Sequence, residues 1–223
     1  MRRLGRNYPL VSAILLSNAA SVGLFIAGAM FYDDSRYWYL NWNLFLAWLP
    51  VLFVLWLVNY LKNHSWQSWQ AIILTLLWLV FLPNSFYIIS DLIHLQTDYI
   101  SNALFTTVMM VSFSVNGLIL GFGSLYIMHR QLLKRIGAQS AHLLIAAVLL
   151  LCSFAIYLGR YLRWNTWDVL INPAGLLFDV SDRIINVREH PQTFVTTVIF
   201  FVLLGSLYAV IWQTAQYLKT SKD

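Results

Sequence analysis

Residues 136–159 read IGAQSAHLLIAAVLLLCSFAIYLG, a stretch of 24 residues that contains no Asp, Glu, Lys or Arg. A helix rises about 1.5 Å per residue, so this stretch extends about 36 Å as a helix. The hydrocarbon core of a bilayer is roughly 30 Å thick, and about 20 apolar residues cross it. The stretch is therefore long enough and apolar enough to form a transmembrane helix.

Five further uncharged stretches of at least 25 residues lie elsewhere in the chain, at 7–32, 37–61, 63–90, 99–129 and 190–218. Charged residues make up 10% of the chain, whereas a soluble domain has about 25%. The stretches are continuously apolar and lack the alternation of transmembrane β-strands. We therefore predict an all-α polytopic membrane protein: a single transmembrane domain over residues 1–223, amphipathic interfacial helices in the outer loops, and about six transmembrane helices near 10–32, 40–61, 67–83, 103–128, 140–160 and 193–217.

The basic residues lie mainly at the ends of the apolar stretches. The first stretch follows Arg2, Arg3 and Arg6, and apolar sequence continues through Phe31, too far for a cleaved signal peptide, so we expect a retained helix. Nine of the 14 Lys and Arg residues fall in the N-terminal segment, the second and fourth loops and the tail. Cytoplasmic segments carry such an excess, so we predict cytoplasmic termini. The net charge of +5 is then explained by the basic residues that fix the orientation of the helices. We therefore expect the lipid bilayer as the partner and expect no binding to nucleic acid.

Several residues inside the apolar stretches predict details of helix packing. Pro50 predicts a kink, because it removes a backbone donor and crowds the preceding turn. The GxxxG spacing of Gly117 and Gly121 permits close helix contact, and Asn116 and Asn18 are expected to hydrogen-bond between helices. Cys152 is the one cysteine of the chain, so an intrachain disulfide and a thiolate metal site are excluded.

Ionisable residues are concentrated after the third apolar stretch. Pro83 should stop or bend the helix, and Asn84 or Ser85 can then cap a new turn. Beyond it, Tyr87, Asp91, His94 and Asp98 follow at spacings of 4, 3 and 4, which places them on one face of an amphipathic helix.

Three interpretations of this face remain open. The carboxylates and the imidazole could meet water and lipid headgroups, hold a divalent cation, or form a polar site without metal. The spacing is not a specific metal signature, so we expect no bound metal and no cofactor. In the third interpretation Asp91 and His94 handle protons as catalytic groups.

The fifth loop opens with a second group of functional candidates. Arg160 and Arg163, at i and i+3, would point to a similar side, and Trp164 and Trp167 repeat that spacing. Guanidinium groups beside aromatic rings suit a phosphate or carboxylate next to a sugar or lipid chain, although Trp and Arg also hold helices at the membrane interface. The predicted topology places this strip beside the Asp91–His94 face. The predicted substrate-binding residues are Asn84, Tyr87, Arg160, Arg163, Trp164, Asn165, Trp167 and Asp168.

The rest of this loop predicts an amphipathic helix of about four turns. After the turn at 172–175, apolar residues such as Leu177 and Ile184 alternate with Asp179, Asp182 and Arg183. Its apolar face is too interrupted to span a bilayer, so we expect it to lie on the outer membrane surface as a lid. Residues 188–190 are expected to be a solvated start of the last helix.

The chain carries the motifs Asn43-Leu44-Phe45-Leu46-Ala47-Trp48, Phe81-Leu82-Pro83-Asn84, Tyr87, Asp91-Leu92-Ile93-His94-Leu95, Gly159-Arg160 and Arg163-Trp164-Asn165-Thr166-Trp167-Asp168. Together these motifs resemble those of the domain-of-unknown-function family 1361, small bacterial multi-pass membrane proteins. The resemblance covers most of the chain, and Ser85-Phe86 departs from the Ala-Pro pair of the family. It implies a bacterial cell-membrane protein of this size and implies no activity.

Two functions remain open, and the sequence does not decide whether the protein is an enzyme. In the first, the chain binds or processes an amphipathic anionic substrate, such as a lipid-linked one, at the extracytoplasmic face. Here Arg160 and Arg163 hold the anion. In the second, it is a non-catalytic assembly or scaffold subunit, and the sequence names no protein partner. The chain has no Walker motif, no Rossmann glycine pattern and no HExxH motif. ATP-driven transport, nucleotide-dependent oxidoreduction and zincin-type proteolysis therefore lack support.

Overall fold

The computed structural model describes residues 8–32, 35–97 and 102–221, and these residues form helices and connecting turns without a β-strand. Six candidate membrane spans lie in this part of the chain, which confirms the all-α polytopic fold. The long helices are α1 (Tyr8–Tyr32), α2 (Tyr39–Tyr60), α3 (Trp69–Tyr87), α5 (Ala103–Leu132), α6 (Ala138–Tyr161) and α9 (Pro191–Thr220). The short helices are η1 (Arg36–Trp38), η2 (Ile88–Ile93), α4 (His94–Thr97), α7 (Asp168–Ile171) and α8 (Pro173–Ile185).

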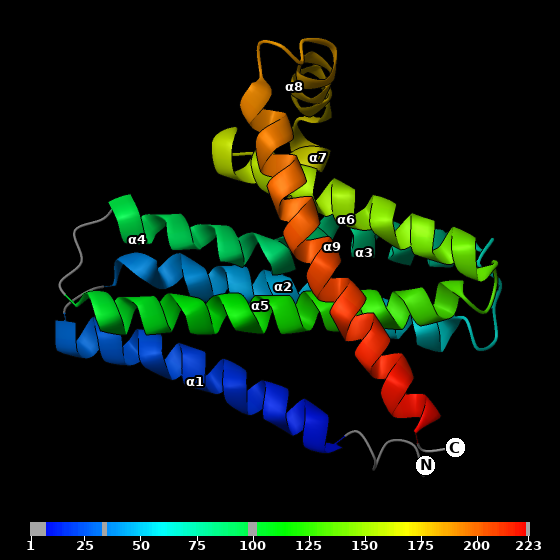
Figure 1. Cartoon of the computed structure of the whole chain (residues 1–223), viewed down its shortest axis with the longest axis horizontal. Coiled ribbons are helices and arrows are strands. Elements are labelled where there is room, and N and C mark those ends of the chain that lie inside the picture. Colours follow the sequence, from blue (N-terminus) through cyan, green and yellow to red (C-terminus); the bar gives the residue numbers. More distant parts are fainter. Residues whose placement is uncertain (1–7, 33–34, 98–101, 222–223) are drawn as a thin grey trace.

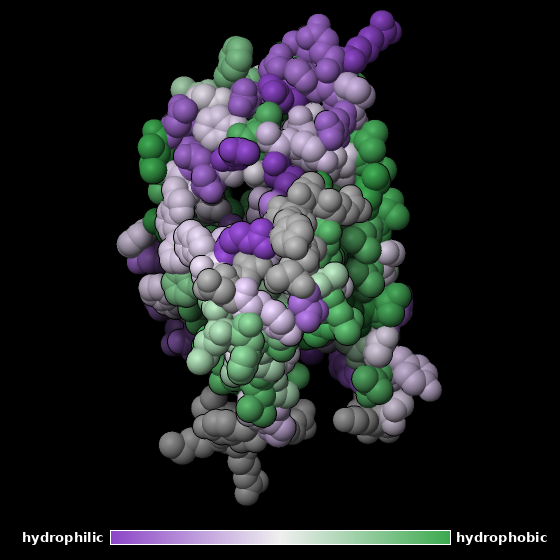
Figure 2. Space-filling model, turned by 90° about the vertical axis from the view of Figure 1, so that its left-hand side faces the viewer, coloured by the Kyte–Doolittle hydropathy of each residue, from purple (hydrophilic) through white to green (hydrophobic). Residues whose placement is uncertain are grey.

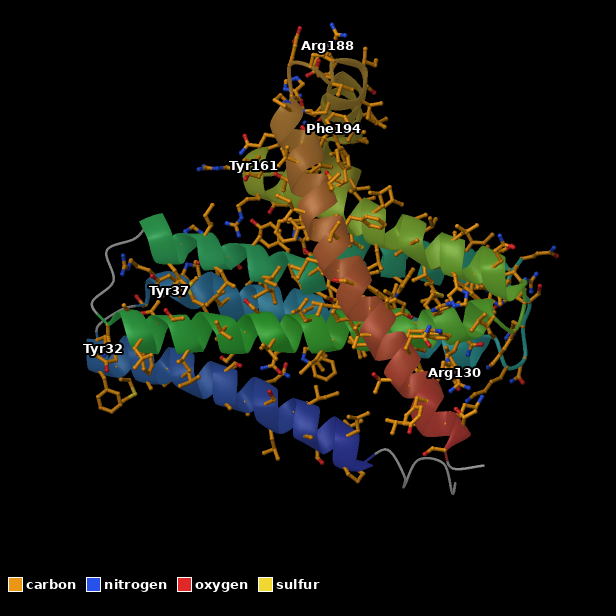
Figure 3. The ribbon with its side chains drawn as sticks, viewed as in Figure 1. Tyr32, Tyr37, Arg130, Tyr161, Arg188 and Phe194 are labelled. Atoms are coloured by element: carbon orange, nitrogen blue, oxygen red, sulfur yellow. The ribbon has the colours of Figure 1, made fainter. Side chains whose placement is uncertain are left out.

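The long helices form a bundle in which α2, α3 and α5 run side by side (Figure 1). Helix α1 packs along α5 at one edge, α6 packs along α3, and α9 crosses α6 obliquely. Successive connections alternate between the two ends of the bundle. Tyr32 and Tyr37 lie at one end and Arg130 lies at the other (Figure 3).

Two groups of buried side chains form the core. One group joins α2, α3, α5, α6 and α9 and contains Trp78, Phe86 and Tyr208. The other joins η1, α2, η2 and α5, with Tyr37 and Phe113 among its largest members. Hydrophobic side chains cover the flanks of the molecule (Figure 2), where a lipid bilayer would contact them.

The two glycines of the GxxxG motif confirm the predicted close packing. A Cβ atom at Gly117 would lie 2.6 Å from the backbone oxygen of Ser85, and one at Gly121 would lie 2.6 Å from the Phe86 ring. Real Cβ atoms essentially never lie within 3.0 Å of such an atom, so something would have to shift. Any larger residue would therefore push α5 away from α3 and η2.

The asparagines predicted to link helices do so. Asn18 of α1 donates to the side-chain oxygen of Asn116 of α5 at 2.9 Å, and Asn116 donates to Ser21 at 2.8 Å. The indole of Trp48 in α2 donates to Asn18 at 3.1 Å. These bonds tie α1 to the rest of the bundle.

Pro50 and Pro83 lie inside continuous helices, Pro50 in α2 and Pro83 in α3. Pro83 was predicted to stop or bend the third helix, and a stop is wrong, because α3 continues to Tyr87 and is followed directly by η2 and α4. The predicted cap at this point is absent: Asn84 donates to the Phe81 carbonyl and Ser85 donates to the Ala47 carbonyl of α2. Tertiary packing of the buried end of α3 thus outweighs the loss of one backbone donor.

The predicted amphipathic helix of the fifth loop is α8. The side chain of Asn172 caps its first turn by accepting from the Gly175 N–H at 3.1 Å. Its apolar side chains Leu177, Phe178 and Ile185 are exposed. Helices α7 and α8 lie beyond the C-terminal end of α6 (Figure 1).

Candidate functional site

A single guanidinium, that of Arg160 at the C-terminal end of α6, holds together the polar face that follows α3. Its Nη2 forms an ion pair with Asp91 Oδ1 and donates to Ser90 Oγ at 2.8 Å. Its Nη1 lies 3.3 Å from His94 Nε2, and its Cζ lies 4.8 Å from the centre of the Tyr87 ring. The predicted grouping of Tyr87, Asp91 and His94 is therefore present, and it is built around Arg160.

The backbone brings these residues together in two ways. Residues three apart in a 3₁₀-helix lie above one another, and η2 carries Ser90 and Asp91 between Tyr87 and His94. Helix α6 comes close because Gly159 faces Tyr87: a Cβ atom there would lie 2.9 Å from the ring. Arg160, the next residue, thereby reaches the polar face.

The ion pair is largely shielded from solvent. The side chain of Asp91 is 3% exposed and that of Arg160 is 14% exposed. Asn43 of α2 donates to the second oxygen of Asp91 at 3.0 Å. Both carboxylate oxygens are thus satisfied by donors from two other helices, as a buried charge requires.

Asn43 and Ser90 belong to this cluster but were not predicted as site residues. The signal for Asn43 is an amide inside an apolar helix, which needs a partner when it is buried. For Ser90 the signal is its position next to Asp91. Neither signal identifies the partner, because the packing of α2 and α6 against η2 is a tertiary property.

His94 contacts two elements besides its own. A guanidinium N–H can only donate, so the Nη1 contact makes His94 Nε2 an acceptor, and a neutral ring then carries its proton on Nδ1. The ring centre lies 5.8 Å from that of Tyr39. His94 Nε2 can therefore exchange a proton only where its contact with Arg160 opens.

A cavity of about 570 Å³ lies beside this cluster. Figure 2 shows a hollow bordered by hydrophilic residues on the end of the molecule where α4 lies. Polar and aromatic side chains line one part of the cavity, and aliphatic side chains line the rest. The lining residues are Tyr39, Trp42, Asn43, Leu46, Val80, Pro83, Asn84, Tyr87, Asp91, His94, Ala155, Leu158, Gly159, Arg160, Trp164, Asn165, Thr166, Trp167, Val169 and Leu176.

Residues after α6 close one wall of the cavity. Thr166 donates to and accepts from the side chain of Asn84, at 3.2 and 2.9 Å. The Trp167 ring packs edge-on against Phe81, with centroids 5.6 Å apart. The Trp164 indole donates to Asp179 of α8 at 2.7 Å. This wall is therefore joined to α3 on one side and to α8 on the other.

Two of the predicted binding residues do not line this cavity. Arg163 follows the end of α6 with a φ of 59°, and its side chain is exposed. The helical spacing that would have placed it beside Arg160 is lost, because α6 ends at Tyr161. Asp168 accepts from the backbone N–H of Asn165 at 2.7 Å and so stabilises the turn.

The described residues contain no group of three or more His, Cys, Asp or Glu side chains that could hold a metal ion. Asp98, the fourth residue of the predicted face, lies outside the described residues. Around Asp91, donors from Arg160 and Asn43 occupy the positions that a cation would need.

Residues 42–207 match the model of a protein family described as "Protein of unknown function (DUF1361)". No curated protein and no solved structure matches the chain. The matched range contains Asn43, Asp91 and Arg160, and it begins after α1. The ion-pair cluster therefore lies wholly within the part shared with this family.

Proposed function

We propose that this chain, which belongs to the DUF1361 family of unknown function, binds an amphipathic anionic molecule, lipid-linked or lipid-like, in the cavity beside Arg160. The chain is an integral membrane protein with six candidate spans. In this proposal the ligand reaches the cavity from the bilayer in which these helices lie.

One observation supports this function most: a guanidinium forms part of the wall of a cavity whose other walls are aromatic and aliphatic. Arg binds phosphate and carboxylate groups through its planar fork of donors. Trp42 and Trp164 provide flat surfaces for a sugar or a ring, and Leu158 and Leu176 suit a hydrocarbon chain. The anion would contact Arg160 and the chain would lie along these apolar side chains.

The proposal assigns proton handling to Asp91 and His94. Without a ligand, the Arg160 charge is balanced by Asp91, so an anion has to compete with this carboxylate. When Arg160 turns to the ligand, one oxygen of the Asp91 carboxylate and His94 Nε2 lose their donor, while Asn43 still donates to the other oxygen. Both then become able to accept a proton from a bound hydroxyl or phosphate group.

We further propose that the cavity opens to the extracytoplasmic side of a bacterial membrane, with both termini in the cytoplasm. In a Cys152→Ala background, a cysteine at exposed Arg188 should react with an impermeant thiol reagent in intact cells. A cysteine at Gln139, in the α5–α6 region, should react only after lysis. Figure 3 places Arg188 beyond the bundle at the tip that precedes α9. The opposite pattern would reverse the orientation.

Binding is tested by the anionic lipids that remain with the protein after purification in mild detergent. Arg160→Lys keeps the charge but loses the fork, so mass spectrometry should show about a tenfold loss, the equivalent of 1.4 kcal/mol. Arg163→Lys is the matched control, because Arg163 is exposed and does not line the cavity. It should retain the parental amount.

Asp91→Asn separates binding from a purely structural role. The variant removes the competing carboxylate, so more anionic lipid should remain bound even though the protein is less stable. A structural ion pair predicts the same loss of stability without a gain in bound lipid. A parent protein that retains no anionic lipid, or equal retention in Arg160→Lys and Arg163→Lys, would overturn the proposed function.

The scaffold function remains the second candidate, and one observation favours it. Arg160 makes four hydrogen bonds within the described part of the chain, to Ser90, Asp91 and His94. These contacts join α6 to η2 and α4 without any ligand. If Asp91→Asn binds no additional lipid, the cluster acts as such a connection.

A further inference from the structure

A second cavity, of about 410 Å³, lies between α6 and α9 where they pass the end of α5. His129 lies three residues before the end of α5, and His142 lies four residues after the start of α6. Arg130, the neighbour of His129, lies at the opposite end of the bundle from Tyr37 (Figure 3). The cavity therefore lies near the ends of two candidate spans.

His129 is the most buried of the polar side chains that line this cavity, the others being His142, Ser206, Tyr208 and Gln213. Its Nδ1 lies 2.9 Å from the hydroxyl oxygen of Tyr208, and its ring stacks on Trp212 with centroids 4.0 Å apart. The residue is 1% exposed. Its Nε2 is buried and has no hydrogen-bond partner within the described residues. Buried polar side-chain atoms normally have one, from protein, water or ligand.

The contact with Tyr208 indicates what kind of partner Nε2 needs. If the Tyr208 hydroxyl donates to Nδ1, the ring proton is on Nε2, and this N–H is the one donor of the pair left without an acceptor. If Nδ1 donates instead, both the Tyr208 hydroxyl and Nε2 are left incomplete. The first arrangement leaves fewer groups unsatisfied, so Nε2 offers a hydrogen bond to an acceptor.

The rest of the cavity is suited to a hydrocarbon chain. Ile145, Leu149 and Phe201 line it, and Gly205 leaves it open, because a Cβ atom there would meet nothing within 4 Å. His129 lies about 4.5 Å from the end of its helix, at a rise of about 1.5 Å per residue. The ends of a membrane-spanning helix lie near the interfacial region of a bilayer, where the ester groups of lipids are found.

We propose that this cavity is a binding site for an acyl chain of a membrane lipid, whose ester carbonyl accepts a hydrogen bond from His129 Nε2. The carbonyl supplies the acceptor that the buried N–H lacks. The chain fills the apolar space beside Gly205. This site is independent of the Arg160 cavity, because no residue lines both.

The test uses full-length protein stripped of lipid in detergent and measures stabilisation against heat by two added probes. Dioleoylglycerol carries two ester carbonyls, and its dioleyl ether analogue carries none. The parent protein should bind the ester about tenfold more tightly than the ether, the equivalent of about 1.4 kcal/mol for one hydrogen bond. His129→Phe should bind both equally. Equal affinities in the parent, or a preserved preference in His129→Phe, would overturn the proposal.

A second pair of variants keeps the test valid if His129→Phe does not fold. Gly205→Leu fills the cavity and should abolish stabilisation by the ester. Gly123→Leu adds the same side chain at a helical glycine that also has free space around it and lies outside the cavity. It should bind like the parent. Decylubiquinone is the third probe: if the parent prefers it to the ester, the site is for a quinone and the lipid assignment is wrong.

Discussion

The two cavities differ in how their polar groups are satisfied. At the first, Arg160 and Asn43 both donate to Asp91, so both oxygens of the carboxylate have donors. At the second, the buried His129 Nε2 has no partner in the described part of the chain. A ligand at the first cavity must therefore displace an internal bond, whereas a ligand at the second adds a missing one.

This difference predicts that the two cavities prefer different ligands. Competition with an internal carboxylate favours ligands that carry a full negative charge, because only these match the Asp91–Arg160 attraction. An unsatisfied neutral donor favours any molecule that brings an acceptor into an apolar space. The first site should thus discriminate by charge and the second by the presence of a carbonyl.

The largest expected effect is on the ion pair of the first cavity. Asp91→Ala leaves Arg160 unpaired in a largely buried position and should lower the free energy of unfolding by about 3 to 5 kcal/mol. The double variant Asp91→Leu, Arg160→Met removes both charges and should recover most of this loss. Denaturant unfolding in micelles measures both. A loss below about 1 kcal/mol for Asp91→Ala would show that the pair behaves as an exposed one.

A matched pair of glycine variants compares the packing at the two cavities. Gly159→Ala places a Cβ atom 2.9 Å from Tyr87, so it should cost about 1 to 3 kcal/mol of stability through overpacking. Gly205→Ala meets nothing within 4 Å and should stabilise its helix by about 0.5 to 1 kcal/mol. Thermal unfolding of both variants checks the signs. Equal effects would mean that the second cavity is no more open than the first.

The sequence predicts the fold well, because each apolar stretch is long enough to specify its own helix. The third helix was expected to stop or bend at Pro83, and it runs on to Tyr87. Proline removes only one donor, and the buried side chains Leu82 and Phe86 hold the helix beyond it. The rule that proline ends a helix therefore gave the wrong helix boundary here, because buried side chains stabilise the helix beyond Pro83.

The candidate site was predicted only in part. The spacing of Tyr87, Asp91 and His94 predicts a shared face, and the topology predicts its proximity to Arg160. Arg163 was expected there too, on the assumption that α6 continues, but the helix ends at Tyr161. The partner from α2, Asn43, depends on how that helix packs, which no spacing within one segment encodes.

A smaller effect is expected at the wall of the first cavity, where Trp164 connects to α8. Trp164→Phe removes the hydrogen bond to Asp179 and should cost about 0.5 to 1.5 kcal/mol of local stability. Hydrogen exchange of the α8 amides should accelerate, while that of α5 should not. Trp56→Phe is the control, because the Trp56 side chain is 63% exposed. Unchanged exchange in α8 would show that this bond does not hold the helix.

The smallest effect concerns the turn that joins α8, at the wall of the first cavity, to α9, a wall of the second. Hydrogen bonds from Asn186 and His190 to the Asp182 carboxylate lower the pKa of this group. A lowered pKa stabilises the folded turn at every pH above the ordinary value of about 3.9, and this contribution is lost as the pH falls through the lowered value. Protection of the 186–190 amides should therefore persist at pH 5 and disappear only below about pH 4. Asp182→Asn should have low protection at both pH values, and Asp168→Asn, outside this turn, should behave like the parent. If the parent and Asp182→Asn lose protection at the same pH, another group controls the turn.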